Sequence, residues 1–354
     1  MAGYQIFTDA TSDLTPELLA GLPSVEVIPM NVEIGGTEYS YGNAEGITAK
    51  EFYSLQRDGN FATTSQINPT VYFQYFEPWL RQGIDILYLC FSSGLSGTHQ
   101  SALLAVQELQ EEFPERKIVC IDTLAAAAGE GFLVIEAAKK QMEGLSIDDL
   151  ASWVAGNRLK VCHWFTVDTF THLKHGGRVS GAAAAMGTVL QIKPLLHVND
   201  EGKLQAMEKP RGRKKAVAAQ VARMEQGWIP DLGKSVLIGH ADDPEAAALL
   251  KDKLLERFPD AEIRVTYIGP IIGAHTGPGA LALFYWVPPG LEKPLAVRRG
   301  LLHGVLNGSG GFIQSSIALA SALVEEVAAV GRCRGAIYGM QVLVPERGYI
   351  RKGG

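Results

Sequence analysis

Short apolar runs alternate with longer amphipathic segments through the first 160 residues. The largely apolar runs at 5–7, 25–32, 84–90, 117–121 and 160–167 predict strands, and such runs are typical of a parallel sheet covered on both faces. Between them, a capping box of Thr48 and Glu51, a helix start at Pro69, and the 3.6-residue periods of 101–111 and 133–141 predict helices. This alternating order predicts a doubly wound α/β domain over residues 1–160.

The pattern changes after residue 160. Runs at 192–198 and 203–208 flank Asn199-Asp200-Glu201-Gly202 and predict a hairpin. A helix at 214–225, a strand at 235–239, a helix at 244–257 and a strand at 262–267 follow. These elements predict a mixed α/β second domain over 161–279. A last apolar strand at 281–286 fits either sheet, so residues 280–287 complete the first domain if the strand returns to it.

The segment after residue 287 departs from this alternation. Pro288-Pro289-Gly290 and Pro294 interrupt the pattern and predict a linker over 288–300. Residues 301–354 then read as an extra strand, Gly-rich turn, helix and strand. A β-α-β fragment of this size cannot bury both faces of its strands alone, so its role is left open.

Composition and charge narrow the class of protein. The chain is 47% apolar and 20% charged, as in an ordinary globular protein. A formal net charge of −6 argues against a nucleic-acid partner. We find no secretory signal and no run of about 18 apolar residues, which predicts a cytoplasmic protein without integral membrane contact.

The four cysteines do not have the spacing of a zinc site. Cys90, Cys120, Cys162 and Cys333 are scattered, without a CxxC pair. The first three lie in apolar runs, so we expect buried, reduced thiols. The sequence therefore predicts no metal site.

Small hydroxyl residues gather in five segments, each placed just after a predicted strand: 8–14, 63–69, 92–98, 121–124 and 273–279. Ligands of open parallel sheets bind beyond the carboxyl ends of the strands. Hydroxyls, free backbone N–H groups and the imidazole of His275 can receive an anion. These segments contain no Lys or Arg, which favours a single buried carboxylate over a polyphosphate. The plainer alternative for Thr11, Ser12 and Asp13 is to cap a helix beginning at Pro16.

The same segments carry a family resemblance. TDATSDL, TTSQINP, FSSGLSGTHQSA, IDTLAAAAGEG, LKHGGRVS, IKPLLHVNDEGKL, RGRKKA and GAHTGPGALAL occur in order, and residues from about 4 to 286 resemble the DegV family. The resemblance implies a two-domain DegV-like α/β fold that holds a long-chain fatty acid, such as palmitate or oleate, between its domains. It implies no cofactor and no catalytic residue. It also implies a partner fatty-acid kinase that phosphorylates the bound acyl group, so that the protein is an acyl carrier for phospholipid synthesis.

Site residues follow from the resemblance position by position. Thr64 and Ser93 match carboxylate-binding positions, and His275 with Thr276 matches the pair that completes the head-group site. Ser65 and Ser96 stand close enough in sequence to share this role. Ile67 replaces the usual proline, which affects loop stiffness rather than polar contacts.

Basic residues form a second group of matches. Arg178, and Arg211 together with Arg213, match positions near the mouth of the site, where guanidinium groups suit the kinase or an acyl phosphate. The alternative for these arginines is a solvated surface charge.

The alanine runs at 125–128 and 182–185 either leave room for the acyl tail or pack helices closely. Each buried methylene of such a tail contributes about 0.8 kcal/mol. Acyl length and unsaturation depend on packing that the sequence pattern does not determine.

Three other functions fit the sequence less well. A serine hydrolase acting on a lipid-like ester needs a G-x-S-x-G elbow, and Gly94-Leu95-Ser96-Gly97-Thr98 lacks that spacing. A nucleotide-binding enzyme needs a phosphate-binding loop that precedes a helix, whereas Gly233-Lys234-Ser235 precedes a predicted strand. Residues 300–345 resemble the start of a phosphofructokinase through Gly308-Ser309-Gly310-Gly311 and a later IYG, but Phe312 and Ile317 depart from that pattern. We assign no kinase activity to this segment.

Overall fold

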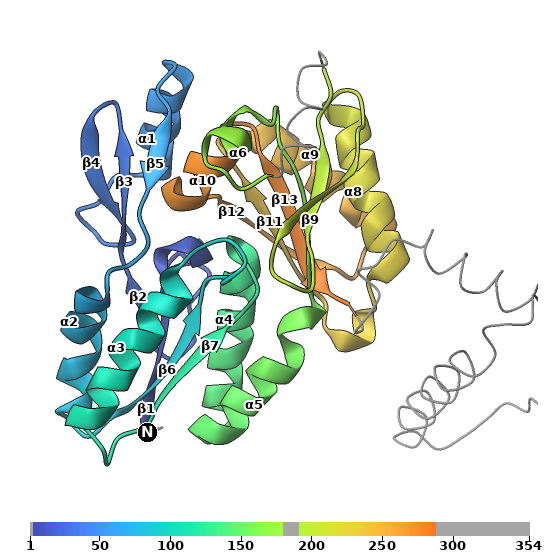
Figure 1. Cartoon of the computed structure of the whole chain (residues 1–354). Helices are drawn as coiled ribbons and strands as arrows, with labels where there is room; N and C mark the ends of the chain where they lie inside the picture. The colour runs from blue at the N-terminus through green and yellow to red at the C-terminus, as the bar shows by residue number, and fades with distance from the viewer. Residues whose placement is uncertain (1–2, 180–190, 288–354) are drawn as a thin grey trace, which may run out of the picture. The chain divides into compact units, whose positions relative to one another are not determined.

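The computed structural model describes residues 3–179 and 191–287 (Figure 1). These residues belong to one compact unit, Met1–Glu292. The predicted linker at 288–300, the fragment at 301–354 and the alanine run at 182–185 lie outside the described residues.

A four-stranded parallel sheet is built from the first half of the chain. Its order is β2 (Val25–Ile28), β1 (Tyr4–Asp9), β6 (Asp85–Cys90) and β7 (Ile118–Asp122). Strand β1 is buried along its whole length, as expected of a strand in a parallel sheet that is covered on both faces. Because all four strands are parallel, their carboxyl ends lie at one edge of the sheet.

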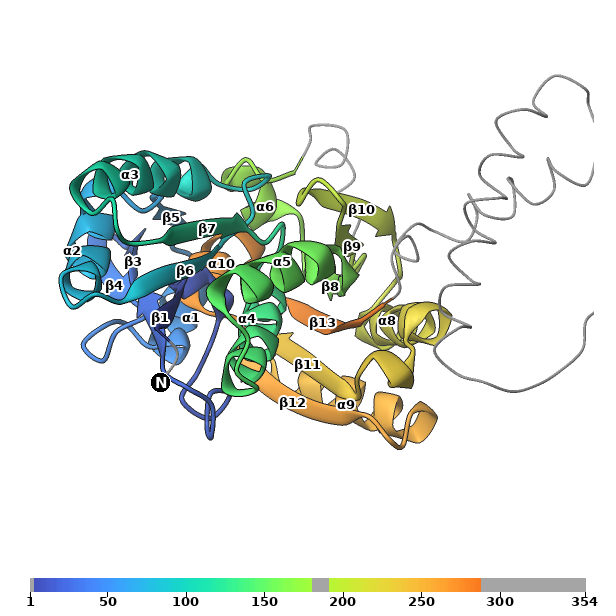
Figure 2. The ribbon, with the colours of Figure 1, turned by 90° about the horizontal axis from the view of Figure 1, so that it is seen from below.

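Helices cover both faces of this sheet, which confirms the predicted doubly wound arrangement. The helices are α2 (Pro69–Leu80) and α3 (Thr98–Glu112) on one face, and α4 (Ala128–Met142) and α5 (Ile147–Asn157) on the other (Figures 1 and 2). Side-chain caps begin α2 at Asn68 and α5 at Ser146, which satisfies backbone N–H groups of the first turn. The sequence pattern did not reveal α5.

A small antiparallel sheet corrects one strand prediction. Its order is β4 (Thr37–Tyr41), β3 (Met30–Ile34) and β5 (Ala62–Thr64). The helix α1 (Ala49–Arg57) lies in the connection between β4 and β5. The single strand predicted at 25–32 is wrong, because it is interrupted at Pro29, which has no backbone N–H to donate. Helix α1 begins with the predicted capping box of Thr48 and Glu51.

The helix predicted to begin at Pro16 is also wrong. The chain instead forms a 3₁₀ turn, η1 (Ala10–Ser12), whose cap is Asp9, and residues 13–24 contain only turns and bends. Asp13 adopts a left-handed conformation with φ 52°. Thr11, Ser12 and Asp13 are all buried and therefore do not cap a surface helix.

A six-stranded mixed sheet forms the second half. Its order is β10 (Leu204–Glu208), β9 (Leu195–Val198), β8 (Val161–Thr166), β13 (Leu281–Trp286), β11 (Ser235–His240) and β12 (Glu262–Tyr267). The other elements are η2 (Arg158–Lys160), α6 (Thr171–His175), α8 (Arg213–Gly227), η4 (Pro230–Leu232), α9 (Pro244–Arg257) and α10 (Pro270–Thr276). The hairpin of β9 and β10 was predicted. Strand β13 pairs antiparallel with β8 and β11, so the final strand joins this sheet and not the first.

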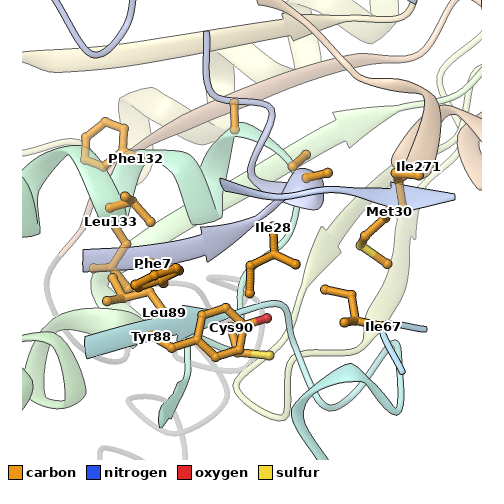
Figure 3. Packing of buried hydrophobic residues seen from close by; sticks show 14 of the residues in the cluster. Phe7, Ile28, Met30, Ile67, Tyr88, Leu89, Cys90, Phe132, Leu133 and Ile271 are labelled. Carbon is orange, nitrogen blue, oxygen red and sulfur yellow. The ribbon is translucent and has the colours of Figure 1, made fainter. Parts of the chain in front are cut away.

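Helix α4 lies between the two large sheets. Its first two turns, residues 128–135, are buried on every side, and they include Phe132 and Leu133. Phe132 meets Trp286 of β13 edge-on at a ring-centroid distance of 5.3 Å, while Leu133 lies near Phe7 of β1 (Figure 3). A helix segment with apolar side chains on several faces, such as Phe132–Ile135, is typical of a helix buried between other elements. The helix therefore forms a shared core for both sheets.

Candidate functional site

A cavity opens at the carboxyl ends of β1, β6 and β7, where they face β5, α10 and the six-stranded sheet. The cavity has a volume of about 830 Å³, which includes the part of its mouth that is open to solvent. Most of its walls are apolar: Met30, Phe91, Leu95, Ala126, Ala127, Phe165, Leu173, Val198, Leu204, Ile268, Ile271, Ile272, Ala282 and Phe284. The polar lining residues are Thr11, Thr64, Ser65, Gln66, Ser96, His163, Arg178, His275 and Thr276. An apolar cavity with a few polar groups is typical of a small-molecule site.

A threonine–histidine pair is the clearest polar feature of the wall. Thr64 Oγ1 at the end of β5 lies 2.8 Å from His275 Nε2 in α10. His275 Nδ1 has no hydrogen-bond partner, and it faces the backbone of Gly176 so closely that a Cβ there would lie 2.1 Å away. The ring is therefore fixed between Gly176 and the Thr64 hydroxyl.

The His275 imidazole is neutral at neutral pH. Burial, together with the neighbouring Arg178 and His175, lowers the pKa of His275 from 6.5 to about 4. A neutral imidazole offers one N–H donor and one acceptor. Because the contact with Thr64 uses one of the two protons of the pair, the pair keeps one further donor and has no formal charge.

Helix α10 is held by three hydrogen bonds from the first half of the chain. The N–H of Gly269 donates to Asp13 Oδ1 at 2.8 Å, and Tyr53 Oη donates to the carbonyl of Ile268 at 2.8 Å. Gln56 Nε2 donates to the carbonyl of Gly273 at 3.2 Å. The position of His275 consequently depends on residues far away in sequence.

Arg178 supplies the one formal charge among the residues that line the cavity. Its Nε donates to the carbonyl of Leu95 at 3.3 Å, and its Nη1 donates to the carbonyl of Gly176. In the same loop, Ser96 Oγ lies 2.9 Å from Thr98 Oγ1. A cation and several hydroxyls therefore lie along the cavity that also contains His275.

The structure brings most predicted site residues to the cavity. Thr64, Ser65, Ser96, His275 and Thr276 line it. Ser93 does not line it: this residue is exposed, and its backbone N–H donates to Asp122 Oδ1 at 3.1 Å.

The basic residues separate into three positions. Arg178 lines the cavity, whereas Arg211 is exposed and lies outside the lining. Arg213 forms ion pairs with Asp168 at 2.6 Å and Asp243 at 3.1 Å. Its guanidinium is therefore engaged within the six-stranded domain.

Sequence reasoning did not single out Gln66, His163 or most of the apolar lining, and it left Thr11 open between an anion-binding segment and a helix cap. Alternation along β8 would have placed His163 on the same face as Phe165. In the alanine run at 125–128, Ala126 and Ala127 line the cavity and Ala128 begins α4. His275 lies in the short helix α10, which begins at Pro270. The glycines of this segment gave no helical pattern in the sequence, so the helix was not predicted.

Within residues 3–179 and 191–287, no group of three or more His, Cys, Asp or Glu side chains could hold a metal ion. No helix in this part of the chain is long and apolar enough to cross a membrane.

The fold and the site define a class: an α/β protein with an internal, largely apolar cavity and a small polar group in its wall. Residues 4–287 match the family described as uncharacterised protein, DegV family. A DegV domain-containing protein of Clostridium perfringens is 42% identical over 285 residues, covering 80% of this chain and 98% of the relative. The chain belongs to the DegV family, and its two-domain α/β fold is the DegV fold.

Solved structures agree. A Thermus thermophilus structure described as fatty acid binding of a DegV family protein has a TM-score of 0.69 and 34% identity, covering 80% of this chain and 99% of that one. DegV of Bacillus subtilis, described as a fatty acid binding protein, has a TM-score of 0.69 and 26% identity, covering 81% and 100%. The Fatty Acid Kinase (Fak) B3 protein of Streptococcus pneumoniae, loaded with linoleic acid, has a TM-score of 0.72 and covers 81% and 100%. Its identity of 21% supports the fold alone.

Replacing Gly176 by alanine should displace the His275 ring. The backbone of Gly176 has an ordinary φ of −75°, so the effect comes from the new Cβ, 2.1 Å from Nδ1. We expect a loss of about 1–3 kcal/mol in the free energy of unfolding, measured by urea denaturation. Gly156→Ala in α5 is the control: nothing lies within 4 Å of its Cβ, and the helix should gain up to about 1 kcal/mol. Equal effects in both variants would contradict the close packing.

The neutral His275 should make stability depend on pH. As pH falls below 6.5, the unfolded chain binds a proton that the folded protein excludes until about pH 4. The contribution of His275 to the free energy of unfolding is therefore complete above pH 6.5 and is lost as the pH falls toward 4. Between pH 7 and pH 5 the wild type should lose up to about 2 kcal/mol more than His275→Gln, measured by urea denaturation at each pH. An identical pH profile for the two proteins would show that His275 is not held neutral.

Proposed function

We propose that this protein binds one long-chain fatty acid, with the carboxylate beside Thr64 and His275 and the acyl tail along the apolar walls. The observation that carries the proposal is the Thr64–His275 pair in the wall of an otherwise apolar cavity. The fatty-acid binding named for the Thermus and Bacillus relatives supports it.

The polar groups match a carboxylate better than other anions. When the Nε2–H of His275 donates to Thr64 Oγ1, the Thr64 hydroxyl is free to donate to a carboxylate, and the Ser96 hydroxyl can donate as well. Arg178 is the single cationic residue among those lining the cavity, which fits a single negative charge. A phosphate or polyphosphate would leave charge uncompensated in a buried place.

The apolar walls supply the binding free energy. Each methylene removed from water contributes about 0.8 kcal/mol. Phe91, Phe165 and Phe284, from three different strands or strand ends, line the same cavity. A long acyl chain therefore gains affinity in proportion to the length that is enclosed.

The carrier role is the second part of the proposal. We infer that the protein presents the carboxylate to a partner fatty-acid kinase, since Arg178 lines the cavity and Arg211 is exposed on the adjoining domain. In this proposal the protein is not itself an enzyme, and it works in the cytoplasm as a carrier for phospholipid synthesis. The inference of a partner fatty-acid kinase rests on the resemblance to the DegV family.

A lipid-ester hydrolase is the alternative function. His275 contacts the Thr64 hydroxyl, and Ser96 Oγ contacts Thr98, so neither pair joins a serine to a histidine. Turnover of a long-chain ester by the purified protein, abolished by Ser96→Ala, would favour this alternative over the carrier.

Removing the Thr64 hydroxyl should weaken fatty-acid binding. Hydrogen bonds to a charged group contribute about 1.5–3 kcal/mol, so Thr64→Val and His275→Ala should each raise the Kd for oleate roughly 10- to 100-fold. Native mass spectrometry detects a co-purifying acid, and calorimetry gives the Kd.

The control is Thr63→Val, on the same strand but exposed and outside the cavity lining. It should bind oleate as the wild type does. The affinity of Ser93→Ala for oleate tests the prediction that Ser93 binds the carboxylate. A wild-type protein that is empty and binds neither oleate nor palmitate would refute the proposed function.

Neutralising Arg211 should slow transfer to the kinase without weakening fatty-acid binding. A charge at the rim of an interface mainly affects encounter with the partner. With a fatty-acid kinase, ATP and labelled oleate, Arg211→Ala should lower the rate of acyl phosphate formation roughly tenfold, which corresponds to about 1.4 kcal/mol. Arg257→Ala, an exposed arginine of α9 paired with Glu225, is the control. Equal rates for Arg211→Ala and the wild type would remove Arg211 from the kinase contact.

A further inference from the structure

Three acidic side chains are buried at the place where η1 meets α4. Asp9 and Glu130 have no exposed surface, and Asp13 is 2% exposed. The buried polar residues in the described part of the chain include no Lys or Arg. These acids therefore have no buried cation as a partner. Three unpaired carboxylates cannot remain ionised together in such a place.

A single hydroxyl lies between two of these acids. Thr11 Oγ1 is 2.5 Å from Asp9 Oδ1 and 2.7 Å from Glu130 Oε2. A threonine hydroxyl has one proton to donate, so it can satisfy only one of the two oxygens as a carboxylate. The other contact requires a proton on the acid itself, which then donates to Thr11 Oγ1.

The remaining contacts show which acid holds that proton. Asp9 accepts from the backbone N–H groups of Thr11 and Phe91, at 3.0 and 3.2 Å, and from Tyr88 Oη at 2.8 Å. Several donors stabilise a carboxylate. Glu130 receives only the Thr8 hydroxyl at 2.9 Å in addition to Thr11. The proton therefore belongs on Glu130.

The charges around Glu130 lead to the same assignment. Burial raises the pKa of Glu130 well above its usual range, and the neighbouring Asp9 and Asp13 raise it further. From β8, His163 packs against Gly129 beside Glu130, and burial lowers the pKa of this histidine to about 4, so it adds no positive charge. From β6, Tyr88 is neutral because burial raises its pKa well above the usual range.

We propose that Glu130 is a neutral carboxylic acid at physiological pH, and that it donates a hydrogen bond to Thr11 and so fixes this part of the cavity wall. Thr11 lines the cavity, and so does Phe91, whose N–H is bound to Asp9. Glu130 thus acts through Thr11 as a positioning residue. Its effect on ligand affinity rests on the proposed fatty-acid function, whereas its protonation state does not.

Infrared spectroscopy of Glu130→Gln tests the proton directly. The wild-type-minus-variant spectrum at pH 7 should contain the carbonyl band of a protonated carboxyl group. Glu136→Gln is the matched control on α4, because Glu136 is ion-paired with Lys139 at 2.7 Å, and its difference spectrum should contain carboxylate bands. Carboxylate bands for Glu130 would overturn the proposal. A fatty acid bound to both proteins cancels in the difference spectrum, so this result is independent of the proposed function.

Stability against pH gives a second readout. The folded protein retains a proton on Glu130 that the unfolded chain releases above about pH 4.3, so this group's contribution to stability falls as pH rises toward the folded pKa. The folded-to-unfolded ratio of Glu130→Gln relative to wild type should rise about tenfold per pH unit between pH 5 and pH 7. A flat ratio would overturn the proposal. So would a Glu130→Gln protein that cannot fold, because the amide reproduces both hydrogen bonds of a neutral acid.

Oleate binding then tests the positioning role. Glu130→Ala should raise the Kd about tenfold, and Glu130→Gln should restore affinity close to that of the wild type. Equal affinity for Glu130→Ala and the wild type would show that Glu130 does not position the wall. If the wild type binds no oleate, the proposed function fails, while the infrared band still decides whether Glu130 is neutral.

Discussion

The burial of α4 between two sheets is the constraint on which the cavity depends. Its first turn is closely packed on both sides: a Cβ on Gly129 would lie 2.2 Å from His163 of the six-stranded sheet, and one on Gly131 would lie 2.3 Å from the carbonyl of Ser12. Glycine is required at these two positions because the backbone of α4 directly contacts both domains. The Ala-Gly-rich segment before Phe132 therefore serves close packing, and it also leaves Ala126 and Ala127 at the cavity wall.

The same packing explains why buried ionisable groups surround the cavity without charging it. Close approach of the two sheets excludes water, and burial favours the neutral form of each group. His163 and His275 both have their pKa lowered to about 4, and the pKa of Glu130 is raised. Hydrogen bonds to Thr64 and Thr11 then orient His275 and Glu130, which are not paired with opposite charges.

Much of the fold followed from local patterns, because those patterns have local causes. The apolar run ending at Cys90, the capping box at Thr48 and the helix beginning at Pro244 are each specified by adjacent residues. The separation of β2 from β3 at Pro29 was missed because apolar residues continue across the proline. The pairing of β13 with β8 and β11 depends on contacts between residues more than 40 positions apart, which periodicity does not encode. For the site, the motifs indicated Thr64 and His275, but not that α1 and Asp13 hold α10 in place.

The distribution of charge around the cavity sets the direction in which an amphiphile would enter it. With the histidines neutral, Arg178 is the one residue of the lining that carries a formal charge, and its guanidinium is tied to the loop that contains Leu95 and Ser96. A carboxylate loses the least free energy of desolvation where that charge and the hydroxyls are available. The remaining walls offer a tail apolar contacts and uncharged polar groups such as Thr11, whose hydroxyl is already hydrogen-bonded. In the proposed function, a fatty acid is therefore oriented chiefly by keeping the rest of the cavity uncharged, and the neutral state of Glu130 is part of that requirement.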